Sequence, residues 1–373
     1  MIKVLNVLSC LSNGGTESFV MNNYRNIDRE KIKIDFFIFT HSKPQYIEEI
    51  TKNGNNIYFG VTPGIKRLYK FFKIFSKILK NGKYDVVHCH VNIQNFVPII
   101  CSKMCGVKIR ISHSHATNSI PKTVISKMGF YFKRILINSF SNVKLACSEE
   151  AGKSLYGNKI FLKQGKIIRN GIDVSRFLRK EKSHHLLEEF NIDDNCDLIL
   201  GNITRFDDNK NQMFILSVFK KVLRNHPSAI LVLGGTNGGL LDKVQKEAKK
   251  LNIADNVRFI GERTDVAECL SIFDIYIFPS KNEGFGIAVL EAQAAGKVCI
   301  ASEFVTKKTD MGLSLNYYLP LDESIWADTI DDVFRQSGKI TSDRIKDAFI
   351  DNGFDILSSA KELEKTYQKM LYR

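Results

Sequence analysis

Acidic residues are nearly absent from one long stretch of this chain. Between Glu49 and Glu149 the sequence has a single acid, Asp85, and sixteen lysines and arginines. Residues 1–180 hold 30 basic and 10 acidic side chains, a formal net charge of +20, whereas residues 181–373 hold 24 and 30, a net charge of −6. A basic half of this kind predicts an anionic partner, and nucleic acid, an anionic membrane and a lipid phosphate all fit at this stage.

Long hydrophobic runs and paired cysteines are missing as well. No segment approaches the roughly 18 consecutive apolar residues of a membrane span, and the N-terminus reads as a strand rather than as a signal peptide. The eight cysteines include no C-x-x-C pair, which is typical of reduced, buried thiols in a cytoplasmic protein and disfavours a zinc site. The chain of 373 residues exceeds the roughly 250–300 residues at which one core stops growing, so we expect two domains.

Short apolar segments alternate with helical patterns, which predicts two α/β domains with parallel sheets. The predicted strands are 2–8, 34–39, 84–90 and 108–112 in the first half and 198–203, 229–233, 257–260, 274–278 and 298–302 in the second. We place the domain boundary where a polar stretch begins, at residue 179. The first domain is therefore predicted to span residues 1–178 and the second residues 179–354. The amphipathic segment 355–373 is a candidate helix that completes the first domain.

One segment after a predicted strand combines a glycine turn with two glutamates. Gly284 and Gly286 let backbone N–H groups approach a ligand, and the N-terminus of the helix that follows favours an anion such as pyrophosphate. Glu283 lies in the turn. Glu291 lies about two turns into a largely apolar helix, where a carboxylate can accept hydrogen bonds from two neighbouring hydroxyls. An ordinary surface turn would not explain why Glu291 is flanked by apolar residues.

This motif resembles the E-x7-E signature of the GT-B glycosyltransferases, in particular the large family 4 of retaining enzymes. Further motifs follow in the family's order: NGGTE at 13–17, RNGID at 169–173, ITRFDDNKN at 203–211, LGG at 233–235 and FIG at 259–261. The resemblance extends over nearly the whole chain and is strongest to bacterial capsular and exopolysaccharide transferases. It implies a GT-B fold, in which two Rossmann-like domains face each other across a cleft.

The resemblance also implies transfer of a sugar from a nucleotide-sugar donor, expected to be a UDP-sugar, to a lipid-linked or saccharide acceptor. Glu283 would contact the donor sugar, Glu291 would hold the ribose hydroxyls, and Arg205 with Lys210 would neutralise the diphosphate. No metal or other cofactor is expected, because two cations and a helix N-terminus carry the charge of the leaving group. The other implied donor-binding positions are Gly14, Gly15, Gly234, Gly284, Phe285, Gly286 and Ile287.

Two histidines, His113 and His115, stand at the end of a predicted strand. Residues two apart on a strand point the same way, and the resembled family carries a histidine near the donor sugar in this region. We therefore predict a catalytic role for one of them, and the sequence leaves open which. His88 and His90 on the preceding strand are expected to be core or supporting residues. Four histidines also suggest a metal site, but no acid lies near them in the sequence.

A stripe of five lysines marks the helix predicted at 66–80. The stripe consists of Lys66, Lys70, Lys73, Lys77 and Lys80, and the opposite face consists of Leu68, Phe71, Phe72, Phe75, Ile78 and Leu79. A second basic and apolar stretch, 126–140, contains Lys133 and Arg134. The plain interpretation is a helix packed on its sheet with solvated lysines. The sharper one adds contact with anionic lipid, at about 1 kcal/mol per basic residue, and predicts attachment to the inner face of the cell membrane.

Two other functions remain open on this evidence. A nucleotide-sugar 2-epimerase shares the two-domain architecture, although neither the E-G-F-G motif nor the basic helices favour it. A nucleic-acid-binding protein would explain the basic first half. Against that function, the sequence has no recognition motif, and its aromatics interleave with lysines on a helix rather than on a strand platform.

Overall fold

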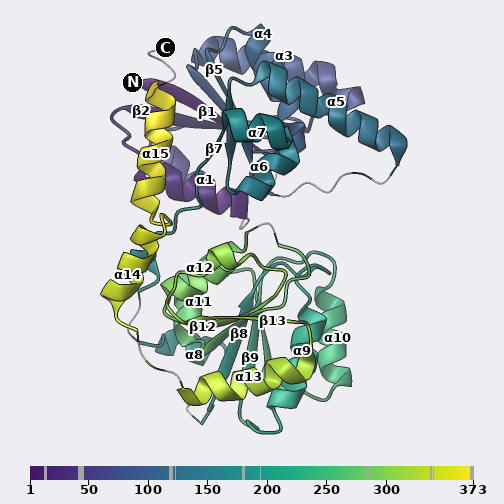
Figure 1. Ribbon diagram of the computed structural model, residues 1–373, viewed down its shortest axis with the longest axis vertical. Helices are drawn as coiled ribbons and strands as arrows, with labels where there is room; N and C mark the ends of the chain where they lie inside the picture. The colour runs from purple at the N-terminus through teal and green to yellow at the C-terminus, as the bar shows by residue number, and fades with distance from the viewer. Residues whose placement is uncertain are drawn as a thin grey trace. The chain divides into compact units, whose positions relative to one another are not determined.

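The computed structural model describes residues 1–11, 15–40, 46–116, 121, 123–178, 181–193, 195–283, 285–336, 338 and 340–369. The chain divides into two compact units (Figure 1). The first consists of residues 1–171 and the C-terminal segment from Ile356, and the second consists of residues 172–355. The boundary precedes the predicted one at 178/179, because Ile172 and Phe177 are buried in the core of the second unit.

The first unit contains a seven-stranded parallel sheet of order β3-β2-β1-β4-β5-β6-β7. Its strands are β1 (Ile2–Leu8), β2 (Ile32–Ile38), β3 (Ile57–Phe59), β4 (Val86–Cys89), β5 (Ile109–Ser114), β6 (Val143–Ala146) and β7 (Gly165–Ile167). The four strands predicted in this half are confirmed with small shifts at their ends. The strands β3, β6 and β7 were not predicted, because they are only three or four residues long and lack an extended apolar run.

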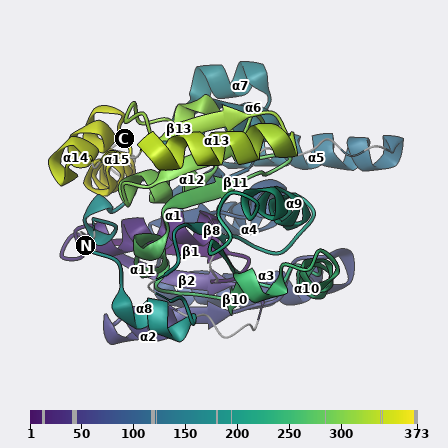
Figure 2. The same cartoon turned by 90° about the horizontal axis from the view of Figure 1, so that it is seen from below.

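Helices cover both faces of this first sheet (Figure 1). Phe19 of α1 (Gly15–Asn26) and Tyr367 of α15 (Ile356–Lys369) share a core with Val4. On the other face, α3 (Leu68–Gly82) buries Phe71 and Phe75 in a core that also contains Val87 of β4. The remaining helices are α2 (Ile47–Lys52), α4 (Phe96–Met104), α5 (Val124–Phe140), α6 (Glu149–Tyr156) and α7 (Asn158–Gln164). Of these, α5 extends past the edge of the sheet (Figure 2).

The second unit contains a six-stranded parallel sheet of order β10-β9-β8-β11-β12-β13. Its strands are β8 (Ile199–Ile203), β9 (Ile230–Gly234), β10 (Val257–Gly261), β11 (Ile275–Phe278), β12 (Val298–Ser302) and β13 (Asn316–Leu319). Its helices are α8 (His184–Glu189), α9 (Gln212–Val222), α10 (Leu241–Lys250), α11 (Val266–Ile272), α12 (Ile287–Ala294), α13 (Glu323–Gln336) and α14 (Ser342–Asp351). The five strands predicted here are confirmed. The sixth, β13, is half-buried throughout and has no hydrophobic alternation to reveal it.

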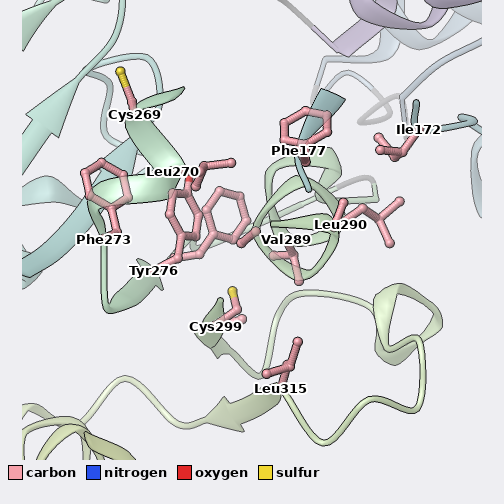
Figure 3. Packing of buried hydrophobic residues seen from close by; sticks show 14 of the residues in the cluster. Ile172, Phe177, Cys269, Leu270, Phe273, Tyr276, Val289, Leu290, Cys299 and Leu315 are labelled. Atoms are coloured by element: carbon pink, nitrogen blue, oxygen red, sulfur yellow. The ribbon is translucent and has the colours of Figure 1, made fainter. Parts of the chain in front are cut away.

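A buried hydrophobic cluster holds α12 against this second sheet. Tyr276 of β11 packs in it with Leu270 of α11 and with Val289 and Leu290 of α12 (Figure 3). Burial of apolar side chains is the main favourable term in folding, so this packing fixes where α12 begins. The start of α12 and the carboxyl ends of β8 and β11 are the parts of the second unit that carry the predicted site.

Candidate active site

Two of the predicted donor-binding side chains meet at the carboxyl edge of the second sheet. Nζ of Lys210, in the loop after β8, lies 2.6 Å from Oε2 of Glu283, in the loop after the neighbouring strand β11. Both side chains are less than one-fifth exposed, at 19% and 18%. The ammonium also lies 4.7 Å from the ring centroid of Phe278, where the ring's quadrupole attracts a cation. A cation and a carboxylate thus lie together at the edge where open α/β sheets bind ligands.

Two polar residues that the sequence analysis missed tie these loops together. Oγ of the buried Ser280 lies 3.0 Å from Oε2 of Glu283, and Nδ2 of Asn209 donates to Oγ of Ser280 at 3.2 Å. The backbone N–H of Lys281 donates to the carbonyl of Asn209 at 2.8 Å. Glu283 is therefore held in position by its own loop and by the loop that carries Lys210. Asn209 lies inside the 203–211 motif and Ser280 lies three residues before Glu283, and these positions are the only sequence signal that could have revealed them.

The glycine turn enters α12 at Gly286, whose φ of 86° lies in the left-handed region that favours glycine. Phe285 and Ile287, on either side of it, were predicted to bind the donor. The side chain of Phe285 is buried and its ring stacks on Phe354 at a centroid distance of 5.3 Å, and Ile287 packs against the same core. The two side chains anchor the start of the helix, so a donor would contact this segment through its backbone.

The other predicted glycines have separate positions. Gly234 ends β9, and a Cβ there would lie 2.9 Å from Cγ1 of Ile260, so close packing against β10 is enough to explain this glycine. Gly15 is the first residue of α1. Gly14 and Gly284 lie outside the described residues.

Arg205 follows β8 as predicted, but the structure pairs it with Asp207. Its Nε lies 2.7 Å and its Nη2 2.6 Å from Oδ2 of that carboxylate. The arginine side chain is 65% exposed. Exposed ion pairs contribute about 0–1 kcal/mol, so a more highly charged diphosphate could displace Asp207.

Glu291 occupies the second turn of α12 and is half-buried. Burial raises the pKa of its carboxyl to about 7, and the positive charge of Arg176 opposes this rise. Arg176 lies in the turn η3 (Val174–Arg176), just after the RNGID motif, and the sequence analysis did not single it out. The carboxyl therefore changes between its neutral and charged forms near neutral pH, and donors such as sugar hydroxyls would stabilise the charged form.

Glu291→Gln is expected to raise the melting temperature of the protein at about pH 8 and to change it little at about pH 5. Because the pKa of Glu291 is raised on folding, the favourable contribution of its protonated form is lost as the pH rises through about 7. Thermal unfolding at the two pH values measures the effect. Glu247→Gln is the matched control, since Glu247 lies on α10 beside Lys250. An equal shift at both pH values would show that burial of the charge is not the cause.

His88, His90, His113 and His115 form one cluster at the carboxyl ends of β4 and β5. Nε2 of His88 lies 3.1 Å from Nδ1 of His113, and Nδ1 of His90 lies 2.9 Å from Nε2 of His115. Burial lowers the pKa of all four rings, that of His115 to about 3, so they are neutral at physiological pH. Phe19 of α1 packs against both His113 and His115. The structure thus joins the two predicted histidines to the two that were expected only to support them.

The predicted lysine stripe is exposed on the surface of the first unit. All five side chains, on α3 and on the turn η1 (Ile65–Arg67) before it, are exposed: Lys66, Lys70, Lys73, Lys77 and Lys80. Phe71, Phe75 and Leu79 are buried on the opposite face, as the helical spacing predicted. Leu68, placed on the buried face by the sequence, is 40% exposed because it stands at the first residue of the helix.

Lys133 and Arg134, the two residues of α5 that were predicted to contact the membrane, differ from the lysines of α3. The guanidinium of Arg134 donates to the carbonyls of Leu155 and Ser154 at 3.1 and 2.7 Å, which satisfies groups at the end of α6. The ammonium of Lys133 lies over the ring of Phe96 at 5.5 Å. Arg134 was predicted to help with membrane contact, but its charge is committed to the fold. Besides the polar Ser126, Lys127 and Ser139, α5 exposes six apolar side chains, namely Val124, Ile125, Met128, Tyr131, Phe132 and Ile135.

Comparison with known proteins places the chain in a family. One family model, described as Glycosyltransferase Family 4, matches residues 13–176, and another, Glycosyl transferases group 1, matches residues 183–308. EpsF of Bacillus subtilis is 30% identical over 377 residues, which cover 98% of this chain and 96% of EpsF. The chain belongs to the family 4, group 1 glycosyltransferases. Membership of this family establishes glycosyl transfer as the activity, rather than the epimerase or nucleic-acid-binding alternative.

Other relatives of the glycosyltransferase agree with this assignment. CapH of Staphylococcus aureus, a capsular polysaccharide biosynthesis glycosyltransferase, is 26% identical over 98% of the chain and 99% of its own length. The solved structure of Anabaena HepE in complex with UDP and glucose superposes with a TM-score of 0.79 at 17% identity, covering 99% of this chain and 100% of HepE. That structural likeness confirms the predicted GT-B fold. None of the helices in the described ranges has both the length and the hydropathy of a membrane span.

Proposed function

We propose that this glycosyltransferase moves a sugar from a UDP-sugar, with retention at the anomeric carbon, to a lipid-linked or saccharide acceptor in capsular or exopolysaccharide synthesis. The observation that carries the proposal is the ion pair of Lys210 and Glu283 at the carboxyl edge of the second sheet, beside the start of α12. Two relatives support the substrates. HepE binds UDP and glucose, and an Escherichia coli relative, 23% identical over 79% of this chain and 78% of its own length, is a UDP-Gal:alpha-D-GlcNAc-diphosphoundecaprenol alpha-1,3-galactosyltransferase.

The ion pair suggests how donor binding rearranges the site. A diphosphate beside the start of α12 would attract the ammonium of Lys210 and the guanidinium of Arg205, and the helix N-terminus would add partial positive charge. Glu283 would then lose its partner and become free to accept hydrogen bonds from hydroxyls of the donor sugar. Glu291 would accept hydrogen bonds from the ribose. Once the donor is bound, these groups would already be in place when charge develops on the departing diphosphate, which is the most effective form of electrostatic catalysis.

Sugar transfer by the wild-type protein is expected to survive EDTA. The second unit supplies cations for the leaving group, and within the described residues no group of three histidine, cysteine or acidic ligands with metal-binding spacing lies at Lys210. The experiment measures transfer from a panel of UDP-sugars with and without EDTA and reads the anomeric configuration of the product by NMR. A manganese-dependent transferase in the same buffer is the control. Complete inhibition that magnesium or manganese restores would refute the metal-free mechanism, and an inverted product would refute retention.

We also propose that the first unit attaches reversibly to the anionic inner face of the cell membrane. The exposed lysines of α3 supply charge, and the exposed apolar side chains of α5 supply hydrophobic contact. Both helices pack against α4. At about 1 kcal/mol per basic residue near an anionic surface, five lysines give several kcal/mol, which is enough for reversible binding to a membrane that carries a phosphate-bearing lipid acceptor.

Changing the five lysines to glutamine is expected to abolish co-sedimentation with anionic vesicles at physiological salt. Screening there acts over about 8 Å, so binding by the wild type should also weaken as salt rises. The control variant carries glutamine at the four exposed lysines of α10, namely Lys243, Lys246, Lys249 and Lys250. Equal binding of the wild type to neutral and anionic vesicles, or an equal loss in the control, would mean that the stripe is an ordinary solvated face.

A further inference from the structure

A continuous hydrogen-bond chain runs from the C-terminal helix to the carboxyl end of β5. The hydroxyl of Tyr367 in α15 lies 2.9 Å from Nδ1 of His88 on β4. Nε2 of His88 lies 3.1 Å from Nδ1 of His113 on β5, and the two ring planes are within 3° of parallel. All three side chains are fully buried. Each of these three side chains therefore fixes whether the next one donates or accepts a hydrogen bond.

The tyrosine sets the direction of this chain. A phenol has one hydrogen to donate, and in the described part of the protein His88 is the only hydrogen-bond partner of the Tyr367 hydroxyl. A buried O–H that donated elsewhere would have no acceptor, which is costly, so it donates to Nδ1 of His88. Both histidines are neutral and carry one N–H each. His88 must then carry its hydrogen on Nε2 and donate to Nδ1 of His113, which leaves the hydrogen of His113 on Nε2.

The chain ends in a donor that has no acceptor. Nε2 of His113 is buried and has no hydrogen-bond partner among the described residues. A parallel chain runs beside it: Oδ1 of Asn6 accepts from Nε2 of His90 at 3.2 Å, and Nδ1 of His90 accepts from Nε2 of His115 at 2.9 Å. Within the part of the chain that the structure describes, that leaves Nδ1 of His115 as a buried acceptor without a donor. Unpaired buried polar atoms are rare in native proteins, and here an unpaired donor and an unpaired acceptor stand on neighbouring, stacked rings.

We propose that Tyr367 and His88 are positioning residues that hold His113 as its Nε2–H tautomer, so that His113 offers a hydrogen-bond donor and His115 an acceptor to one hydroxyl of the ligand. A hydroxyl matches the pair because it can accept from one ring and donate to the other. The inference rests on the proposed function, because the sugars of the proposed reaction supply the hydroxyl. It gives both candidates a role, His113 as donor and His115 as acceptor, and it makes a side chain of the C-terminal helix part of the site.

A metal ion is the competing explanation for the cluster. Ring nitrogens of His88, His90 and His113 lie within 4.8 Å of one another, close enough to suggest three ligands. Both nitrogens of His88 and both nitrogens of His90 are already engaged in hydrogen bonds, however. No carboxylate in the described ranges is hydrogen-bonded to these rings, so a buried dication would keep its full charge, which is unfavourable. The hydrogen-bond chain, by contrast, breaks none of these hydrogen bonds and buries no net charge.

The tautomers can be read directly by long-range ¹⁵N–¹H NMR on protein labelled at histidine nitrogen, with no substrate present. We expect His88 and His113 each to show a protonated Nε2 and an unprotonated Nδ1. A hydrogen on Nδ1 of either ring would overturn the proposal. Adding zinc to the same sample tests the competing explanation, because stoichiometric binding that shifts these resonances would mean that the cluster is a metal site and that the proposal is wrong.

Tyr367→Phe removes the hydroxyl that starts the chain and keeps the packed ring. We expect His88 and His113 to lose their single tautomer and kcat for sugar transfer to fall about two- to tenfold, the size of one lost hydrogen bond. Tyr24→Phe is the matched control, since Tyr24 is buried in the same core but its hydroxyl bonds Asn55, 3.0 Å away. Unchanged tautomers in Tyr367→Phe, or an equal loss of activity in the control, would overturn the role of Tyr367. Failure of the wild type to use any UDP-sugar would refute the proposed function alone, since the tautomers are read without substrate.

Discussion

Replacing Lys210 by methionine is expected to lower kcat for sugar transfer by about 100- to 1,000-fold, the usual loss when one preorganised group that stabilises developing charge is removed. Methionine keeps most of the length and apolar stem of lysine and removes only the ammonium that lies 2.6 Å from Glu283. The loss should appear in kcat more than in KM, because the ammonium acts most strongly when the diphosphate departs. Steady-state kinetics with the best UDP-sugar measures it.

The control for this variant comes from the neighbouring loop. Lys281→Met removes a cation two residues from Glu283, but Lys281 is 44% exposed and pairs at 2.9 Å with Asp208 on the surface. We expect its kcat to stay within about threefold of wild type, since exposed ion pairs contribute little. Because Lys210→Met leaves the carboxylate of Glu283 without its cation, thermal unfolding must show that the variant is folded. Equal losses in the two lysine variants would contradict a specific role for Lys210.

Replacing Glu291 by alanine is expected to weaken UDP binding roughly ten- to a hundredfold. Losing a hydrogen bond to a charged group costs about 1.5–3 kcal/mol, and that free energy corresponds to this range of affinity. The experiment is calorimetry at about pH 8, where a carboxyl with a pKa of about 7 is mostly ionised and can accept from both ribose hydroxyls. Alanine removes the carboxylate and makes no new contact.

Two comparisons make this prediction specific. Glu247→Ala on α10 changes a glutamate whose carboxylate pairs with Lys250 at 3.4 Å, and this variant should bind UDP as tightly as the wild type. Glu283→Ala should reduce turnover far more than UDP affinity, because Glu283 is proposed to contact the sugar rather than the nucleotide. If Glu291→Ala binds UDP as tightly as the wild type, the ribose assignment is wrong.

The length and burial of each strand decided whether its sequence predicted it. Strands such as β1, β8 and β11 are flanked by turn residues and buried along most or all of their length, so their apolar runs were sufficient evidence. The strands β3 and β7 have three residues each, and β13 is half-buried, so their local sequences carry no distinct period. Pairing with neighbours in the sheet, rather than their own composition, makes these segments strands.

The sequence by itself determined the local features of this protein. Periodicity in α3 placed its lysines on the exposed face, and the glycines around Phe285 marked the turn into α12, because such patterns depend on residues within one or two turns of each other. Only the tertiary structure decided which distant residues meet. Lys210 and Glu283 are 73 positions apart and His88 and Tyr367 are 279 apart, and their contacts follow from strand order and helix packing, which no local pattern specifies. For the same reason only the packed structure showed that Arg134 serves α6 and that Phe285 belongs to the core.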